Sequence, residues 1–521
     1  MHLRRPLEIR LAVMLACAFL AAGSTSVSAA TTHWVNDDSP KGRPYAPPGR
    51  SCNRPGYPTI QSAVDAAAPG DRINVCAGTY TEEVTIPPGK DNIELRSVQF
   101  WAAVIKAPPV MLGVTKSIVR VNGAQNVTIL AFTITGPGSE PCDSLRYGVR
   151  VDDSGSADIL GNHITHIHDT PFSACRSGIG VEVGESDEST PGAARILGNA
   201  IDTYQRGGVR VSSDGSFAEV SYNRILGVGP TMVRFQNGVA VTDGATATVQ
   251  HNFVAGNINS LQTVHSAGIV LIQSGQVSVD HNTLTFNDSG VGMVVPASGS
   301  TTTNNHVTAS TFDGIALESA LSSRVAFNRV ERNGGSGIVL DDSQGNEIDG
   351  NDVRRNGTEN SDAPDTTDGI RVTAFSTFNT LRNNHAKGNV THDCHDDSVG
   401  PGTAATANSW IDDRGETSQP QGICTPDTDD GDDDHDRDDD HDRDHHDGDG
   451  DHDRDGDHDH GDDHDGREGD HSWKRAKTAG WDAQYARYFR GLPLGAALES
   501  WPASMATDTA TLLMKAGVDR R

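Results

Sequence analysis

Large aromatic side chains are scarce in this chain: Phe, Trp and Tyr make up 5% of its 521 residues, whereas glycine alone supplies 56. A core built from such residues depends on small and aliphatic side chains, as the cores of stacked repeats do. Basic residues are also few, because 42 Lys and Arg stand against 71 Asp and Glu, for a formal net charge of −29. Nucleic-acid binding needs a basic face, so we expect no nucleic-acid partner.

Long apolar runs are missing beyond the N-terminus, so we expect no membrane-spanning helix. At the N-terminus, arginines are followed by the apolar run Leu11–Ala22 and by a small-residue cleavage site that ends at Ala29. This order is typical of a secretory signal peptide, which we place at residues 1–29. We therefore expect a secreted protein, either extracellular or periplasmic.

No two cysteines have the Cys-x-x-Cys spacing, so neither a redox pair nor a zinc knuckle is indicated. Six cysteines follow the signal peptide: Cys52, Cys76, Cys142, Cys175, Cys394 and Cys424. An even number in an exported chain predicts disulfides, for which 15 connectivities exist. Pairing between sequence neighbours (52–76, 142–175 and 394–424) is the most economical, and each bond would stabilise a local loop by about 3 kcal/mol.

One short pattern recurs nine times between residues 148 and 390, in which a glycine precedes an apolar residue, any residue and another apolar residue. The nine glycines are Gly148, Gly178, Gly208, Gly238, Gly268, Gly290, Gly314, Gly337 and Gly369. An asparagine usually follows each glycine after 14 or 15 residues, as at Asn162, Asn223, Asn252, Asn282, Asn305, Asn328, Asn351 and Asn384. Asn199 comes later than this spacing, because residues 185–191 form an apparent insertion.

These repeats predict short strands that are too brief to fold alone and that bury an aliphatic column when they stack in parallel. The expected column is Val149, Ile179, Val209, Val239, Ile269, Val291, Ile315, Ile338 and Ile370. The recurring asparagine would occupy a turn, where it tolerates left-handed backbone angles and its amide bonds to the next turn. A stack with about 22–30 residues per turn is a parallel β-helix, here of roughly twelve turns.

A helical face precedes the repeats, formed by Ile60, Ala63, Val64 and Ala67 and ended by Pro69 and Gly70. Such a helix would cover the open edge of the first turn. The combination resembles the pectin-lyase-like superfamily of right-handed parallel β-helix proteins with short β-helix repeats, over residues 33–424. The resemblance implies an all-β solenoid with a short N-terminal capping helix. The segment around Trp410 resembles the closing segment of secreted members, which implies that Trp410 and a 394–424 disulfide seal the last turn.

Members of that superfamily are often polysaccharide lyases, hydrolases or epimerases. A polygalacturonase-type hydrolase is disfavoured, because Gly-His-Gly, Asn-Thr-Asp and Arg-Ile-Lys motifs are absent. The segment Asp393-Cys394-His395-Asp396 resembles a motif of alginate epimerases that has Pro in place of Cys394. A structural disulfide at Cys394 is the simpler interpretation of this segment.

Four charged residues are expected to gather on one outward face of three adjacent turns: Arg150, Asp152, Glu182 and Arg210. A lyase needs a base and a positive group that stabilises the sugar carboxylate, so these residues are candidate catalytic residues that could grip an acidic polysaccharide with Ca²⁺. The alternative is a ladder of surface salt bridges. Farther along the same face Val270, Ile272, Val294 and Val295 form an apolar strip, which a loop or self-association would cover.

Histidines also offer possible metal ligands, because His163, His166 and His168 cluster near one turn. A solvated turn position is the simpler account of these three. Residues 425–472 are different in kind: from residue 427 to residue 471 there are 23 Asp, nine His and no apolar residue. This composition predicts a disordered acidic tail.

Within this tail, six aspartates have offsets similar to those of a calcium loop: Asp451, Asp453, Asp455, Asp457, Asp459 and Asp462. Asp stands where an EF-hand needs Glu, so weak multivalent binding of Ca²⁺, Zn²⁺, Ni²⁺ or Cu²⁺ is the expectation. A solvated polyelectrolyte is the alternative. Residues 473–521 form a basic segment that could contain a short helix.

Two functions are therefore predicted. The first is binding or processing of an acidic polysaccharide or cell-surface glycan, of lyase type if catalytic. The second is a non-catalytic surface or periplasmic scaffold that binds divalent metal through the Asp/His-rich tail.

Overall fold

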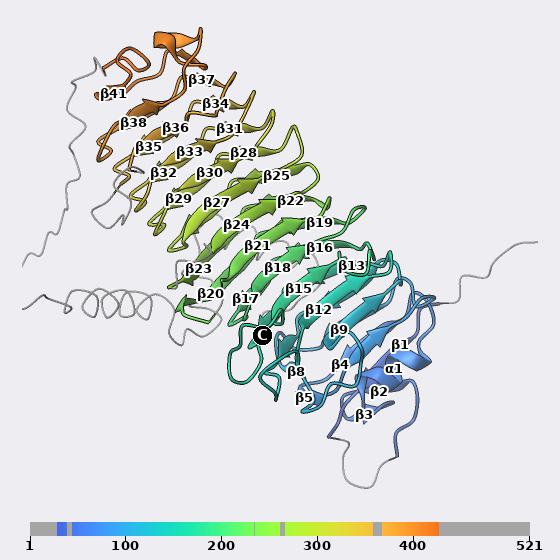
Figure 1. Ribbon diagram of the computed structural model, residues 1–521. Coiled ribbons are helices and arrows are strands. Elements are labelled where there is room, and N and C mark those ends of the chain that lie inside the picture. Colours follow the sequence, from blue (N-terminus) through green and yellow to red (C-terminus); the bar gives the residue numbers. More distant parts are fainter. Residues whose placement is uncertain (1–28, 39–43, 234, 261–265, 358–366, 427–521) are drawn as a thin grey trace, which may run out of the picture.

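The computed structural model describes residues 29–38, 44–233, 235–260, 266–357 and 367–426. The predicted signal peptide up to residue 28, the acidic tail from residue 427 and the basic segment lie outside these described residues. Within them the chain winds into a stack of coils, and each typical coil contributes one strand to each of three long parallel sheets (Figure 1). The predicted parallel β-helix is confirmed.

The first sheet has 14 strands. They are β1 (Thr32–Val35), β4 (Arg72–Val75), β7 (Glu94–Ser97), β10 (Val127–Leu130), β13 (Ser156–Leu160), β16 (Ala193–Leu197), β19 (Phe217–Ser221), β22 (Thr246–Gln250), β25 (Val277–Asp280), β28 (Thr301–Thr303), β31 (Arg324–Ala326), β34 (Glu347–Asp349), β37 (Thr380–Arg382) and β40 (Ser409–Ile411). All of its strand pairs are parallel.

The second sheet has 12 strands and the third has 13. The second contains β5 (Gly78–Thr81), β8 (Ala103–Lys106), β11 (Thr133–Thr135), β14 (His163–Thr165), β17 (Ala200–Asp202), β20 (Arg224–Thr231), β23 (Phe253–Asn259), β26 (Thr283–Thr285), β29 (His306–Thr308), β32 (Arg329–Glu331), β35 (Asp352–Arg354) and β38 (His385–Lys387). The third contains β6 (Val84–Ile86), β9 (Ser117–Asn122), β12 (Tyr147–Asp152), β15 (Ile179–Val183), β18 (Gly207–Val211), β21 (Asn237–Thr242), β24 (Ala267–Ile272), β27 (Ser289–Val294), β30 (Ile315–Glu318), β33 (Ile338–Asp341), β36 (Ile370–Val372), β39 (Cys394–Asp396) and β41 (Ser418–Gln419).

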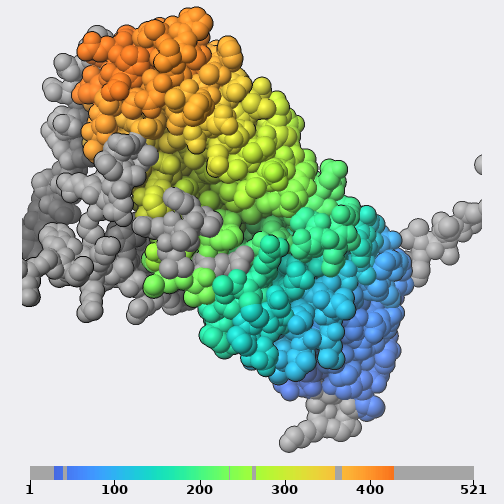
Figure 2. Space-filling view, viewed as in Figure 1, coloured from blue at the N-terminus to red at the C-terminus, as the bar shows by residue number. Residues whose placement is uncertain are grey.

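Two short strands and a 3₁₀ turn also lie outside the three long sheets. Strands β2 (Gly49–Ser51) and β3 (Arg54–Pro55) form an antiparallel pair near the N-terminal end, and a 3₁₀ turn covers Thr403–Ala405. The described coils stack into one elongated body, seen from its blue N-terminal coils to its orange C-terminal coils in Figure 2. No helix among the described residues has the length and apolar character needed to cross a membrane.

The core is a continuous aliphatic column, as the repeats predict, but one coil has a different register. Val149 pairs with Val181 rather than with Ile179. This coil carries two glycines, Gly178 and Gly180. When the coils stack, Gly180 rather than Gly178 occupies the repeat position. A Cβ on Gly180 would lie only 2.6 Å from a carbonyl oxygen of the next coil, so this position tolerates no side chain.

Asparagines form the predicted ladder between coils. Asn282 is buried; its side-chain oxygen accepts from the backbone N–H of Asn252 at 2.9 Å, and its amide donates to the side-chain oxygen of Asn305 at 3.0 Å. The left-handed backbone, however, belongs to the residue before the ladder asparagine, such as Tyr222 (φ 55°) or His281 (φ 52°). The positive φ of this preceding residue turns the chain. The predicted left-handed angle at the asparagine itself is therefore wrong.

Both ends of the solenoid are closed as predicted. Helix α1 (Ile60–Ala66) buries Ile60, Ala63 and Val64 against the first coils, and the side chain of Thr59 caps its N-terminus. At the other end the indole of Trp410 is buried and donates to Asp396 at 2.8 Å. All three predicted disulfides, Cys52–Cys76, Cys142–Cys175 and Cys394–Cys424, are present.

Candidate functional site

The four predicted site residues come together on the outward face of the third sheet. Because of the altered register, Glu182 lies between Arg150 and Arg210 in one row across β12, β15 and β18. Nε of Arg210 is 2.8 Å from both oxygens of Glu182, and Nε of Arg150 is 2.6 Å from Asp152. Each arginine of the row therefore has a close carboxylate partner.

A loop closes over most of this row. Arg150, Asp152 and Glu182 are each 0% exposed, and Glu188 of the loop after β15 contacts Arg150 at 2.7 Å. On its other side Asp152 accepts two hydrogen bonds from Arg120. Within this structure the geometry matches the ladder of salt bridges, here buried under a loop rather than on the surface. Direct contact of these three residues with a large substrate would need the loop to move.

Arg210 differs from the other three because it reaches a pocket. Its side chain is 12% exposed, and a second carboxylate, Glu185, contacts it at 3.1 Å. Burial raises the pKa of Glu182 to about 7; Arg210 opposes this shift and Glu185 adds to it. Burial would also raise the pKa of Glu185, but Arg210, Tyr147 and Arg150 outweigh it and hold that pKa below its ordinary value. The two carboxylates thus fix the guanidinium of Arg210 in place.

The pocket has a volume of about 300 Å³ and is lined by four arginines from neighbouring coils: Arg146, Arg176, Arg206 and Arg210. We call it the arginine pocket. The ring of Phe235 and the side chains of Asp187 and Asp243 also line it. The Nε of Arg146 is buried and has no hydrogen-bond partner in the structure. Such a group offers hydrogen bonds to an incoming anion.

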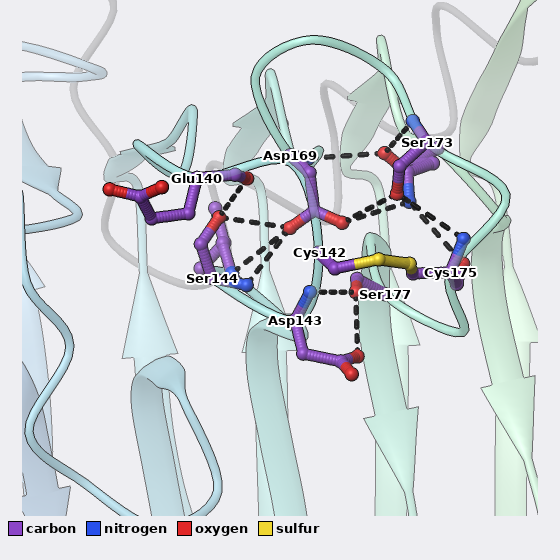
Figure 3. Close-up of a disulfide and its surroundings, with 10 residues drawn as sticks. Glu140, Cys142, Asp143, Ser144, Asp169, Ser173, Cys175 and Ser177 are labelled. Atoms are coloured by element: carbon purple, nitrogen blue, oxygen red, sulfur yellow. Dashed lines mark hydrogen bonds between the residues drawn. A yellow bond between two sulfur atoms is a disulfide. The ribbon is translucent and has the colours of Figure 1, made fainter.

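The loop that leads to Arg146 and the loop that contains Arg176 are tied together by the disulfide Cys142–Cys175 (Figure 3). Asp143 and Ser177 add a pair of hydrogen bonds between the same loops, at 3.0 and 3.1 Å. Beside them the buried carboxylate of Asp169 accepts from both Ser144 and Ser173 (Figure 3). These bonds fix the backbone on either side of the pocket entrance.

The sequence does contain a signal for this pocket, which the motif search missed. Arg146, Arg176 and Arg206 each lie two residues before a repeat glycine and are spaced by 30 residues. These arginines precede the repeat glycine, whereas the four predicted site residues follow it. The apolar strip lies beside the pocket, since Ile272 also lines it. Ile272 and Val295 are exposed in the single chain, and self-association through them stays a prediction.

The three clustered histidines do not converge on one point. His163 pairs with Asp202 at 2.8 Å, His166 bonds to Thr165, and His168 bonds to the backbone of Asp169. The expected metal aspartates of the tail lie outside the described residues, so metal binding there stays a prediction. Among described residues, one group of metal-ligating side chains has its donor atoms within 4.8 Å of one another: Asp368, His392 and His395.

The segment that resembles an epimerase motif, residues 393–396, contains residues with different surroundings. The carboxylates of Asp393 and Asp396 are buried and end hydrogen-bond ladders or bond Trp410, and Cys394 is in a disulfide. Only His395 faces outward, in register with Arg371 of the neighbouring strand. Its hydrogen bond to Asp368 raises the pKa of His395 above its ordinary value.

Comparisons with known proteins agree with the fold. A family model described as a right-handed β-helix region matches residues 237–409. No curated protein matches the chain. Similar solved structures include the Dettilon tailspike protein, with 15% identity, a TM-score of 0.44 and 62% of each chain covered. The periplasmic alginate epimerase AlgG has 13% identity and a TM-score of 0.39, with 68% of this chain and 82% of that chain covered. The A-module of the Azotobacter vinelandii mannuronan C-5 epimerase AlgE4 has 13% identity and a TM-score of 0.38, with 69% of this chain and 94% of that chain covered.

Proposed function

We propose that this right-handed parallel β-helix protein binds an acidic polysaccharide or cell-surface glycan in the arginine pocket. The observation that carries the proposal is the convergence of four arginines on one pocket of a chain whose net charge is −29. Guanidinium groups bind carboxylates through paired, charge-assisted hydrogen bonds, so the sugar unit recognised would be a uronate. Three disulfides support a secreted location, where such polymers are found.

The pocket has further features that suit a sugar. Phe235 lines the pocket, and aromatic side chains are common at sugar-binding sites. Asp187 and Asp243 are exposed at the pocket, so a Ca²⁺ ion shared between them and the uronate is a second part of the proposal. If the protein is catalytic, lyase-type chemistry fits best, because Arg210 would stabilise the negative charge that develops on the sugar carboxylate.

The test measures binding of the full mature chain to acidic polysaccharides such as polygalacturonate and alginate, with neutral dextran as control, with and without Ca²⁺. Arg176→Ala is the informative variant, because Arg176 is exposed and its removal disturbs no core packing. A charge-assisted hydrogen bond contributes about 1.5–3 kcal/mol, so we expect binding about ten- to one-hundredfold weaker. Arg176→Lys should retain part of the affinity.

Arg332→Ala is the matched control, because Arg332 is an exposed arginine outside the pocket. Equal affinity of wild type, Arg176→Ala and Arg332→Ala would refute the pocket as the binding site. Equal retention on dextran would refute recognition of an acidic sugar. Ultraviolet absorbance of new unsaturated uronate ends, followed in the same samples, separates a lyase from a binding protein.

A further inference from the structure

A second cluster lies on the third sheet, several coils beyond the arginine pocket. Asp368 precedes β36, and His392 and His395 flank the start of β39. Strands β36 and β39 are paired, so the three residues come from two adjacent coils. The stacking of the coils therefore sets their separation, rather than a flexible loop.

The three side chains face one another closely. Nδ1 of His392 is 3.1 Å from one oxygen of Asp368, and Nδ1 of His395 is 2.9 Å from the other. Asp368 is 0% exposed and His395 is 8% exposed, whereas the side chain of His392 is 25% exposed, so two of the three ligands are shielded from water. Two imidazoles and one carboxylate form a common ligand set for zinc and related divalent ions.

A second carboxylate orients one of these histidines. Nε2 of His395 is 2.9 Å from Asp397, which leaves Nδ1 directed toward Asp368. Metal-bound histidines typically have this arrangement, in which a carboxylate accepts the hydrogen bond from the ring nitrogen that does not bind the metal. The observation is independent of the three ligands, because Asp397 is not one of them.

Arg371 competes for the same carboxylate, since it contacts Asp368 and Asp397 at 3.2 Å each. The side chain of Arg371 is partly exposed, and its contact with Asp397 can persist when Asp368 turns to a metal ion. The charge of the buried carboxylate of Asp313 also acts on Arg371. The two carboxylates that contact Arg371, those of Asp368 and Asp397, carry one negative charge more than its guanidinium neutralises, which favours a cation.

We propose that Asp368, His392 and His395 bind one zinc-class divalent ion, with Asp397 as the positioning residue for His395. Three protein ligands leave a fourth tetrahedral position for a water molecule or a ligand. The site is separate from the arginine pocket, and its existence does not depend on the proposed glycan binding.

The test must distinguish this site from the nine histidines between residues 427 and 471. We would titrate the full mature chain with Zn²⁺ and measure carbethoxylation of each histidine by peptide mass spectrometry, together with the thermal unfolding temperature. We expect Zn²⁺ to protect His392 and to raise the unfolding temperature. His281, which is exposed, pairs with Asp280 and stacks on His251, is the internal control outside the cluster and should stay reactive.

Three variants make the outcome decisive. His395→Ala should remove the protection of His392, and Asp397→Asn should raise the Zn²⁺ concentration for half-protection about tenfold with all three ligands intact. His281→Ala should change neither. Protection confined to the histidines beyond residue 426, or protection of His392 that survives His395→Ala, would overturn the proposal. Retained cooperative unfolding of each variant without Zn²⁺ shows that a lost signal does not come from misfolding.

Discussion

At the scale of single residues, the site combines arginines whose positions are fixed by buried carboxylates. Arg210 is held by Glu182 and Glu185, whereas Arg150 is enclosed by Asp152 and Glu188. Identical side chains thus have different roles because of one covering loop. No periodicity in the sequence shows where that loop folds, so the sequence identified the charged row but not the accessible member of it.

Among these residues, Asp413 gives the clearest expected dependence of folding stability on pH. Burial raises its pKa to about 6, and bonds from Asn384 oppose the shift. Because the folded pKa is above the unfolded one, the stability that this group contributes is complete below about pH 4 and is lost as the pH rises through 6. We expect Asp413→Asn to be more stable than wild type at about pH 7.5, by about 1–3 kcal/mol, and to lose that advantage at about pH 5.

Urea unfolding at the two pH values measures this difference. Asp214→Asn, a change at an exposed aspartate many coils away, is the control and should keep the wild-type pH dependence. If the stability of Asp413→Asn falls between about pH 5 and about pH 7.5 as much as that of wild type, Asp413 is not the group responsible.

At the scale of elements, the asparagine ladder joins each turn to the next through side-chain hydrogen bonds. Hairpin turns have this connecting role in other β proteins. Asn282→Ala removes an acceptor for the backbone of Asn252 and donors to Val249 and Asn305. The groups left behind are buried and unsatisfied. We expect a loss of about 2–4 kcal/mol in the free energy of unfolding.

Chemical denaturation of Asn282→Ala and of His281→Ala gives the comparison. His281 is the adjacent residue of the same turn, but its ring is on the surface, so its replacement should cost less than about 1 kcal/mol. Similar losses in the two variants would mean that the ladder adds little beyond the packing of the turn.

The ladders also show which parts of the fold can be predicted from the sequence. The ladder through Asn282 has a regular spacing and was predicted, and the same holds for the disulfides and the capping helix. A further ladder, through Asn346, Asn379 and Asn408, was missed because only a few coils carry it. The coil of Gly178 and Gly180 was misaligned by two residues because either glycine fits the pattern, and only stacking against the next coil decides between them.

At the scale of the whole molecule, each coil is stabilised by its two neighbours, so the end coils are the weakest. The disulfide Cys394–Cys424 ties the last coil, with a sequence separation of 30 between its cysteines. Replacing both with alanine should lower the free energy of unfolding by about 3 kcal/mol. Hydrogen exchange should then rise first in β37, β39 and β40, while the coils around β12 keep their protection; a uniform rise along the chain would contradict this view.

Two aspartates at the C-terminal end have a consequence for growth of the stack. Asp413 and Asp393 occupy the last rungs of two ladders, where each accepts from the preceding asparagine. An ionised carboxylate accepts hydrogen bonds but donates none, so it cannot pass the chain of bonds to a further rung. In polymer terms each aspartate is a chain terminator. These two side-chain ladders therefore cannot continue into the first coil of another molecule, which works against growth of the stack end to end into a fibre.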